Sequence, residues 1–259
     1  MIKDKIADFY RYRHVFLDMA VKQLKVRYAG SVLGISLAVF NPILLTMGVV
    51  FAFTAIFNVR MRDFPLFVLA GMFPWMFFVS ALSEATRIFL SQQNILRQFR
   101  LPRETLPASC VLSHFLNYLI GWLFFLPLFL YFNPRVLPLF FLFVFVSLLF
   151  LVFTTGLGLL FSVVHVFCRD VGHLLDIVFM FWMWVTPVFY SADMIPEGLR
   201  WICVMNPMAG FITFYRDVLF FGRVPDLFVF VQVVLWSLGS LCCGAGIFWR
   251  FEPQLLKRI

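Results

Sequence analysis

His165 and Asp170 are spaced as an acid–base pair could be. Four residues separate them in the segment HVFCRD, and a carboxylate at this distance can orient a histidine that serves as general base in acyl transfer. A two-residue pattern arises easily by chance, however, and no further block of catalytic residues lies nearby. The other interpretation is a turn between helices in which Arg169 and Asp170 form an ion pair near lipid headgroups. We favour the turn, and we expect no catalytic residues and no enzymatic activity on this chain.

The sequence also lacks the patterns that bind nucleotides, metals or coupling ions. No GxxxxGK[ST] loop is present, so any ATP must be bound by a partner. The five cysteines show no CxxC spacing, and we expect no metal site. Carriers driven by protons or sodium keep acidic residues or histidines within their spans, whereas His114 is the main such residue here. Proton or sodium coupling is therefore disfavoured.

The segment from Arg97 to Glu104, RQFRLPRE, could bind another protein. It combines basic and apolar residues and is bounded by Pro102 and Pro107. A short helix of this composition is suited to insert into a cleft on a soluble partner. The alternative is a solvated basic loop.

These residues must be positioned by membrane helices. The chain is 63% hydrophobic and 13% charged, where soluble proteins have about 25% charged residues, and its mean hydropathy is +0.94. We predict an all-α membrane protein with one membrane domain, residues 29–259. Its six predicted spans lie between Arg27 and Arg60, and at Phe64–Ser83, Pro107–Phe132, Leu137–Val164, Ile177–Tyr190 and Leu227–Trp249.

Three further segments are predicted outside the regular spans. Residues 1–28 carry charge and apolar residues at helical spacing, which predicts an amphipathic interface helix; an ordinary basic segment that only sets orientation is the alternative. Residues 92–106 contain the basic segment from Arg97 to Glu104 and form the predicted coupling segment, which would contact a partner. Breaks at Thr186-Pro187 and Asn206-Pro207 leave hydrophobic pieces that are too short to span a bilayer. We therefore predict an external re-entrant hairpin over residues 191–225.

The distribution of basic residues predicts the orientation. With the N-terminus in the cytoplasm, fifteen of the 21 Lys and Arg residues fall on the cytoplasmic side, as the positive-inside rule requires. Both termini are then cytoplasmic. The net charge of +8 follows the membrane axis and gives no nucleic-acid footprint.

The sequence contains several short blocks that occur together in one known family. They are RYAGSVLG from Arg27 followed by Pro42, GMFPWMFF from Gly71, LPRETLP from Leu101, Arg169-Asp170, TPVFY from Thr186, and Asn206-Pro207. These blocks resemble the type-2 ATP-binding-cassette export permeases, in the branch that exports O-antigen, capsule and teichoic acid. The resemblance covers essentially the whole chain, although Leu37 stands where members often have Trp.

The resemblance implies a homodimer of permeases in the bacterial inner membrane, joined by two copies of a nucleotide-binding subunit that bind ATP and Mg²⁺. This chain would then carry no cofactor of its own. The implied substrate is a polysaccharide linked to undecaprenyl pyrophosphate, with O-antigen the first choice. The residues expected to couple to the ATPase are Arg97, Phe99, Arg100, Arg103, Glu104, Lys22 and Arg27.

The aromatic residues fit such a substrate. Phenylalanine alone occupies 37 positions, and aromatic faces offer weak, equivalent platforms over which a sugar polymer could slide. By resemblance, spans one and five line the pore. The candidate channel residues are Phe40, Phe51, Phe53, Phe179, Phe181, Trp182, Trp184 and Tyr190.

Two other functions remain open at this point. A related type-2 exporter of capsule, teichoic acid, or a smaller lipid or drug would share the topology. A membrane-embedded acyltransferase would use His165 and Asp170.

Overall fold

The computed structural model describes residues 12–29, 37–56, 58, 60–93, 102–191 and 194–255 of the 259-residue chain. Within those residues the regular structure is helical, and no strand is present. Residues 1–11 of the predicted interface helix lie outside the described residues. So do Arg97, Phe99 and Arg100 of the predicted coupling segment.

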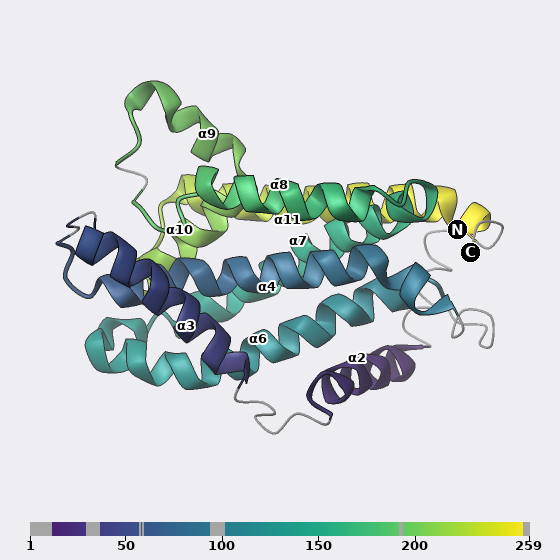
Figure 1. Ribbon diagram of the computed structural model, residues 1–259, viewed down its shortest axis with the longest axis horizontal. Coiled ribbons are helices and arrows are strands. Elements are labelled where there is room, and N and C mark those ends of the chain that lie inside the picture. Colours follow the sequence, from purple (N-terminus) through teal and green to yellow (C-terminus); the bar gives the residue numbers. More distant parts are fainter. Residues whose placement is uncertain are drawn as a thin grey trace.

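Five helices are long and apolar enough to cross a membrane. Their long axes run side by side in Figure 1 except for that of α3, which is inclined to the others. The five are α3 (Leu37–Phe51) with its π-helical continuation η2 (Ala52–Ile56), α4 (Phe64–Ser91), α6 (Thr105–Phe132), α7 (Phe140–Phe167) and α11 (Leu227–Leu255). A short 3₁₀ turn, η3 (Pro134–Val136), precedes α7.

A sixth apolar helix, α8, lies where the fifth of six spans was predicted. It covers Val171–Val185, so it begins six residues earlier than expected and has 15 residues. At 1.5 Å per residue it is about 22 Å long, which is short of the thickness of a hydrocarbon core. The structure therefore gives five candidate spans and one shorter apolar helix among the described residues.

Aromatic packing joins the antiparallel helices α4 and α6. Phe73 of α4 lies 5.0 Å from Tyr118, 5.3 Å from Trp122 and 5.1 Å from Phe125, measured between ring centroids. Gly121 makes the contact possible, because a Cβ there would collide with the Phe73 ring. Much of the phenylalanine surplus is therefore used in the core between helices.

Small residues bring the parallel helices α7 and α11 into close contact. A Cβ on Gly244 would collide with the backbone of Gly156, and a Cβ on Gly156 with that of Ser240. The Ser240 hydroxyl donates to the Phe153 carbonyl at 3.2 Å. Small residues at an interface allow this approach and favour association of membrane helices.

Helix α2 (Arg13–Tyr28) packs along the first half of α6 (Figure 1). Leu17 and Val21 of the predicted apolar stripe are exposed, whereas Ala20 is buried. The Gln23 amide donates to the Ser109 hydroxyl of α6 at 3.4 Å. The face of α2 that meets the protein is thus partly polar, and Leu17 and Val21 point away from it.

The chain between α8 and α11 contains two predicted breaks, and both are confirmed. Helix α8 ends at Val185, immediately before Thr186-Pro187, and α10 (Pro207–Leu219) begins at Asn206-Pro207. Between them lie η5 (Glu197–Leu199) and α9 (Arg200–Met205), neither of which buries a residue. Helix α10, in contrast, is almost wholly buried against α4, α7 and α11.

Candidate functional site

The two breaks meet in space around Asn206. Its side-chain oxygen accepts a hydrogen bond from Met208 N, which caps α10, and one from Trp182 Nε1, both at 3.0 Å. Its amide nitrogen donates to Thr186 Oγ1 at 2.9 Å. Asparagine is a favoured N-cap residue because it satisfies free backbone N–H groups at a helix start. Here the same side chain also fixes the end of α8.

Arg216 of α10 holds the irregular backbone that follows α8. Its guanidinium donates to the carbonyl of Pro187 at 2.5 Å and to that of Val188 at 2.5 Å. It also donates to the Tyr190 carbonyl at 3.1 Å and, from Nε, to the Phe67 carbonyl of α4 at 3.3 Å. Backbone that leaves a helix at membrane depth must find partners within the protein, and Arg216 provides them.

The surroundings of Arg216 are shaped for its side chain. The guanidinium carbon lies 3.7 Å from the centroid of the Phe67 ring, within cation–π range. A Cβ on Gly71 would come within 2.8 Å of Arg216 Nη2 and 3.0 Å of the Val188 carbonyl. Gly71, which opens the GMFPWMFF block, therefore leaves space for this contact.

The other end of α8 is held by Arg87 of α4. Arg87 Nη2 lies 2.5 Å from Asp176 Oδ2 and donates to the Gly172 carbonyl at 2.7 Å. Ser83 donates to Asp176 Oδ1 at 3.2 Å. Helix α8 is thus attached near both of its ends.

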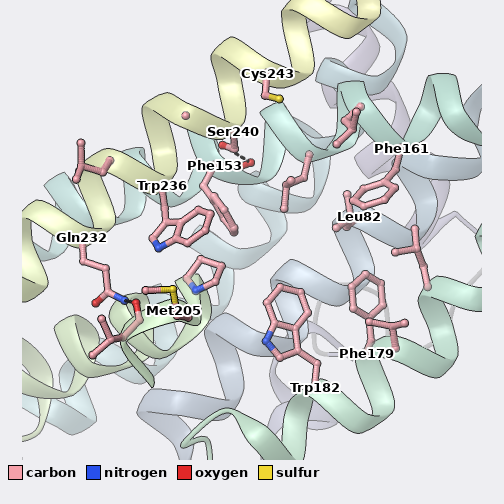
Figure 2. Close-up of a pocket in the computed structure, with 18 of the residues that line it drawn as sticks. Leu82, Phe153, Phe161, Phe179, Trp182, Met205, Gln232, Trp236, Ser240 and Cys243 are labelled. Atoms are coloured by element: carbon pink, nitrogen blue, oxygen red, sulfur yellow. Dashed lines mark hydrogen bonds between the residues drawn. The ribbon is translucent and has the colours of Figure 1, made fainter. Parts of the chain in front are cut away.

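Between these attachments, α8 borders a cavity of about 830 Å³. Figure 2 shows Trp182 of α8 and Trp236 of α11 reaching toward it from opposite sides, with Phe153 and Met205 between them. The lining is almost entirely apolar. It consists of Leu82, Phe153, Leu157, Leu160, Phe161, Leu175, Val178, Phe179, Trp182, Val204, Met205, Pro207, Phe228, Val231, Gln232, Leu235, Trp236, Gly239, Ser240 and Cys243.

The structure divides the predicted channel residues into three groups. Phe179 and Trp182 line the cavity. Phe53 contacts Phe64 and Phe189, and the Tyr190 hydroxyl donates to the Trp184 carbonyl at 2.9 Å. The remaining four are exposed on the outer faces of α3 and α8: Phe40, Phe51, Phe181 and Trp184.

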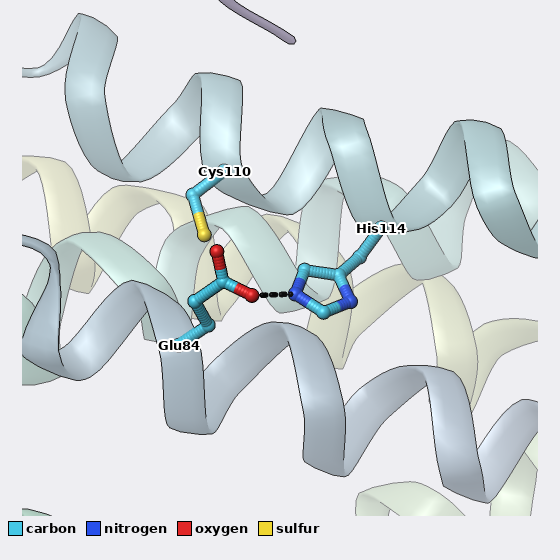
Figure 3. Close-up of side chains that lie close together, drawn as sticks. All are labelled: Glu84, Cys110 and His114. Atoms are coloured by element: carbon cyan, nitrogen blue, oxygen red, sulfur yellow. Dashed lines mark hydrogen bonds and ion pairs between the residues drawn. The ribbon is translucent and has the colours of Figure 1, made fainter. Parts of the chain in front are cut away.

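A polar cluster joins α2, α4 and α6. Glu84 Oε2 lies 2.8 Å from His114 Nε2 (Figure 3). It also lies 2.9 Å from Arg27 Nη2. Cys110 completes a set of three potential metal ligands, whose donor atoms lie within 4.8 Å of one another. Arg27 already balances the charge of Glu84, so the geometry suits a helix-joining ion-pair network. Tyr28 adds a hydrogen bond to Asn117 of α6.

The predicted coupling residues that are described do not share one surface. Arg27 points into the network just described. Arg103 Nη1 donates to the Glu252 carbonyl of α11 at 2.6 Å, and Glu104 is buried at the start of α6. Lys22 is exposed on α2.

His165 and Asp170 do not form a dyad. His165 is buried and its Nδ1 atom has no hydrogen-bond partner among the described residues, while Asp170 is exposed at the start of α8. The expected ion pair between Arg169 and Asp170 is also absent from the described part of the chain.

Sequence reasoning missed the roles of Arg216, Glu84 and Gln232. Arg216 lies in the predicted hairpin, residues 191–225, and no role was predicted for it, although an arginine within an apolar segment usually has a specific partner or function. Glu84 and His114 lie thirty residues apart, and the sequence alone does not bring them together. Gln232 Nε2 donates to the Val204 carbonyl at 2.8 Å. No motif in the sequence around either residue predicts this contact.

The chain matches the family model described as ABC-2 type transporter over residues 15–220. Curated relatives include two O-antigen export system permease proteins RfbA of Klebsiella pneumoniae. One is 30% identical over 84% of this chain and 86% of the relative, and the other is 31% identical over 91% of each. The O-antigen export system permease protein RfbA of Myxococcus xanthus is 28% identical over 98% of each. The resemblance inferred from the sequence blocks is confirmed, and this chain belongs to the ABC-2 type transporter family.

Proposed function

We propose that this chain is the transmembrane permease subunit of an ATP-driven exporter that moves O-antigen, linked to undecaprenyl pyrophosphate, across the bacterial inner membrane. The observation that carries the proposal is the similarity to O-antigen export permeases over 84–98% of the chain. A separate nucleotide-binding subunit would bind and hydrolyse ATP. The apolar helices of the structure support a role within the membrane and not one at an aqueous active site.

The working form is proposed to be a homodimer that meets at α3 and the outer face of α8. Only 11% of the Val39–Ile56 span is buried within the chain, compared with 78% of the apolar window of α4. Phe51, Phe181 and Trp184 point outward from these two elements. A second copy that faced them across a passage would give the aromatic surface a use in transport.

A topology of six crossings with both termini cytoplasmic is part of the proposal. Helices α7 and α11 run parallel, because Ser237 contacts Leu149 and Ser240 contacts Phe153 in the same order. The chain must therefore return between them, and α8 with the residues after it makes that return. The exposed α9 and buried α10 would then form the external re-entrant hairpin, and α2 the interface helix.

The dimer can be tested by disulfide cross-linking in a background from which the five native cysteines have been removed. Phe51→Cys on α3 should form a cross-linked dimer in membranes. Leu123→Cys on α6 is a matched control, because its side chain is also strongly exposed but lies on another helix. Equal cross-linking at both positions, or none at Phe51→Cys, would contradict the proposed interface.

The substrate can be tested by deleting the gene in its native host and separating lipid-linked glycans by compartment. The proposal requires undecaprenyl-linked polymer to accumulate inside while surface glycan disappears. Complementation with Phe181→Ala and Trp184→Ala should restore slower export without loss of the dimer. Normal surface glycan in the deletion strain would refute the function, and full export by the double variant would remove these aromatics from the path.

A further inference from the structure

The cavity between α8 and α11 is elongated along the helices. Its α11 lining residues recur every three or four positions from Phe228 to Cys243, so they form one helical stripe. This stripe rises by about 22 Å at 1.5 Å per residue. One leaflet of a bilayer accounts for about 15 Å, half of the ~30 Å hydrocarbon core. The cavity is therefore longer than the hydrocarbon depth of a single leaflet.

Three polar side chains in the lining are already hydrogen-bonded within the protein. Gln232 Nε2 donates to the backbone carbonyl of Val204, and Trp182 Nε1 donates to Asn206. The Ser240 hydroxyl donates to the Phe153 carbonyl. A sugar would have to bury hydroxyl groups against this lining with few partners, at a cost of about 1–3 kcal/mol each. A hydrocarbon chain needs no such partners.

Basic side chains lie beyond the end of the cavity marked by Phe161 and Cys243. His165 is one turn past Phe161 on α7, and Arg250 is two turns past Cys243 on the same face of α11. The rings of Phe167 and Phe251 are 5.7 Å apart, so these parts of α7 and α11 lie at one level. Asp170 and Asp176 also lie at this end, and Asp176 is bound to Arg87.

His165 and Arg250 are two of the basic groups at this end, where Arg169 and His173 are also exposed. His165 is 7% exposed, and its Nδ1 atom has no hydrogen-bond partner among the described residues. Arg250 is exposed and takes part in none of the ion pairs found in the described chain. An apolar cavity thus ends near hydrogen-bond donors that are suited to a phosphate.

We propose that the cavity binds the polyprenyl chain of a polyprenyl-phosphate-linked substrate, with the phosphate end toward His165 and Arg250. This inference rests on the proposed function and assigns the lipid anchor a site on the permease itself. Because the cavity is longer than one leaflet, it fits a chain longer than the acyl chain of a phospholipid. Phe179 and Trp182 then contact the anchor, and the glycan follows a different surface.

Two adjacent cysteines allow a direct test of occupancy. Both are exposed, but Cys243 lines the cavity and Cys242 lies outside the lining. Single-cysteine variants that retain one or the other are placed in nanodiscs of dioleoyl phosphatidylglycerol and treated with N-ethylmaleimide. Undecaprenyl phosphate should slow modification of Cys243 about fivefold and leave Cys242 unchanged, because a chain bound in the cavity covers Cys243 and keeps the reagent away from it.

Filling the cavity supplies the second arm. A Cβ on Gly239 would meet no atom within 4 Å, so Gly239→Trp can project into the cavity without a backbone clash. It should retain roughly tenfold less undecaprenyl phosphate on purification, because the apolar contact that drives binding is lost. Gly239→Ala controls for removal of the glycine. Leu238→Trp controls for a tryptophan on α11 outside the cavity, and both should bind like the wild type.

Several outcomes would overturn the inference. They are equal protection of Cys242 and Cys243, undiminished binding by Gly239→Trp, or protection by dioleoyl phosphatidic acid as strong as that by undecaprenyl phosphate. The proposed function is judged separately by the deletion strain. Loss of surface glycan without specific binding of undecaprenyl phosphate rejects the cavity site alone, and normal surface glycan rejects the function whatever the binding result.

Discussion

Arg216 and Arg27 show two ways of placing an arginine among membrane helices. Arg216 is buried and is surrounded by backbone carbonyls of the segment after α8, with the Phe67 ring against its guanidinium. Arg27 is partly exposed and is paired with the carboxylate of Glu84. The first arginine completes hydrogen bonds that the backbone has lost, and the second joins helices through opposite charges.

These two environments predict which arginine keeps its contacts permanently and which can release them. If Arg216 withdrew, several carbonyls would be left without donors in an environment that cannot replace them. If Arg27 withdrew, Glu84 would keep its contact with His114 and part of its access to solvent. The junction around Arg216 is therefore expected to be the more rigid of the two.

Replacing Arg216 should have the largest effect. Arg216→Met leaves the carbonyls of Pro187, Val188 and Tyr190 unpaired, at about 1–3 kcal/mol for each buried group. We expect little folded protein, measured as monodisperse yield and melting temperature in detergent. Arg200→Met is the control, because Arg200 is exposed and, among the described residues, forms an ion pair with the exposed Glu197 alone. Wild-type melting of Arg216→Met would show that these hydrogen bonds are dispensable.

The Asn206 side chain should come next. Asn206→Ala removes the cap on Met208 N and the bonds to Trp182 and Thr186, and we expect a loss of about 2 kcal/mol in the free energy of unfolding. Trp182→Phe removes only one of these bonds and should cost about 1 kcal/mol. Thermal unfolding of both variants gives the comparison. Equal losses of unfolding free energy in the two variants would mean that the packing of the Trp182 ring contributes as much to stability as all the hydrogen bonds of Asn206.

A double-mutant cycle on Arg27 and Glu84 tests the second kind of contact. We expect a coupling energy of about 1 kcal/mol between Arg27→Ala and Glu84→Ala, because both side chains are partly exposed. The coupling should fall as salt is added. A coupling as large as the loss from Arg216→Met would erase the contrast between the two arginines.

The smallest effect is expected at Asp176. Asp176→Asn weakens the pair with Arg87, in which both side chains are more than a third exposed, and partly exposed pairs contribute about 0–1 kcal/mol. The melting temperature should change little. A severe loss of folded protein would mean that the Arg87–Asp176 pair contributes as much to stability as the hydrogen bonds of Arg216.

Local patterns in the sequence predicted the helical class and both breaks. Pro187 and Pro207 mark the two breaks, since proline disfavours a helix interior, although Pro42, Pro74, Pro127 and Pro253 are accommodated inside helices. The family blocks follow from short runs such as GMFPWMFF. Local patterns did not fix the number of spans, because α8 starts at Val171 among polar residues and is short. Hydropathy alone does not show whether the residues after a short apolar helix complete a crossing of the membrane.

The site was less predictable, because its contacts join distant parts of the chain. Arg216 reaches Pro187 and Phe67, and Glu84 meets Arg27 and His114, through packing that no spacing rule describes. The role of the aromatic residues in a channel stays a prediction. Their sorting into cavity, junction and outer surface depends on the rotation of α8 about its axis, which composition does not determine.

The attachment of α8 near its two ends has a mechanical consequence. Asp176 at one end and Thr186 at the other are separated by about 15 Å of continuous helix, and the stretch between them borders empty space on one side. A helix transmits axial displacement with little compression, so a push delivered to Asp176 reaches the Thr186 junction almost undiminished. Helix α8 therefore links the Arg87–Asp176 pair to the Asn206 junction, with the cavity along one side of it.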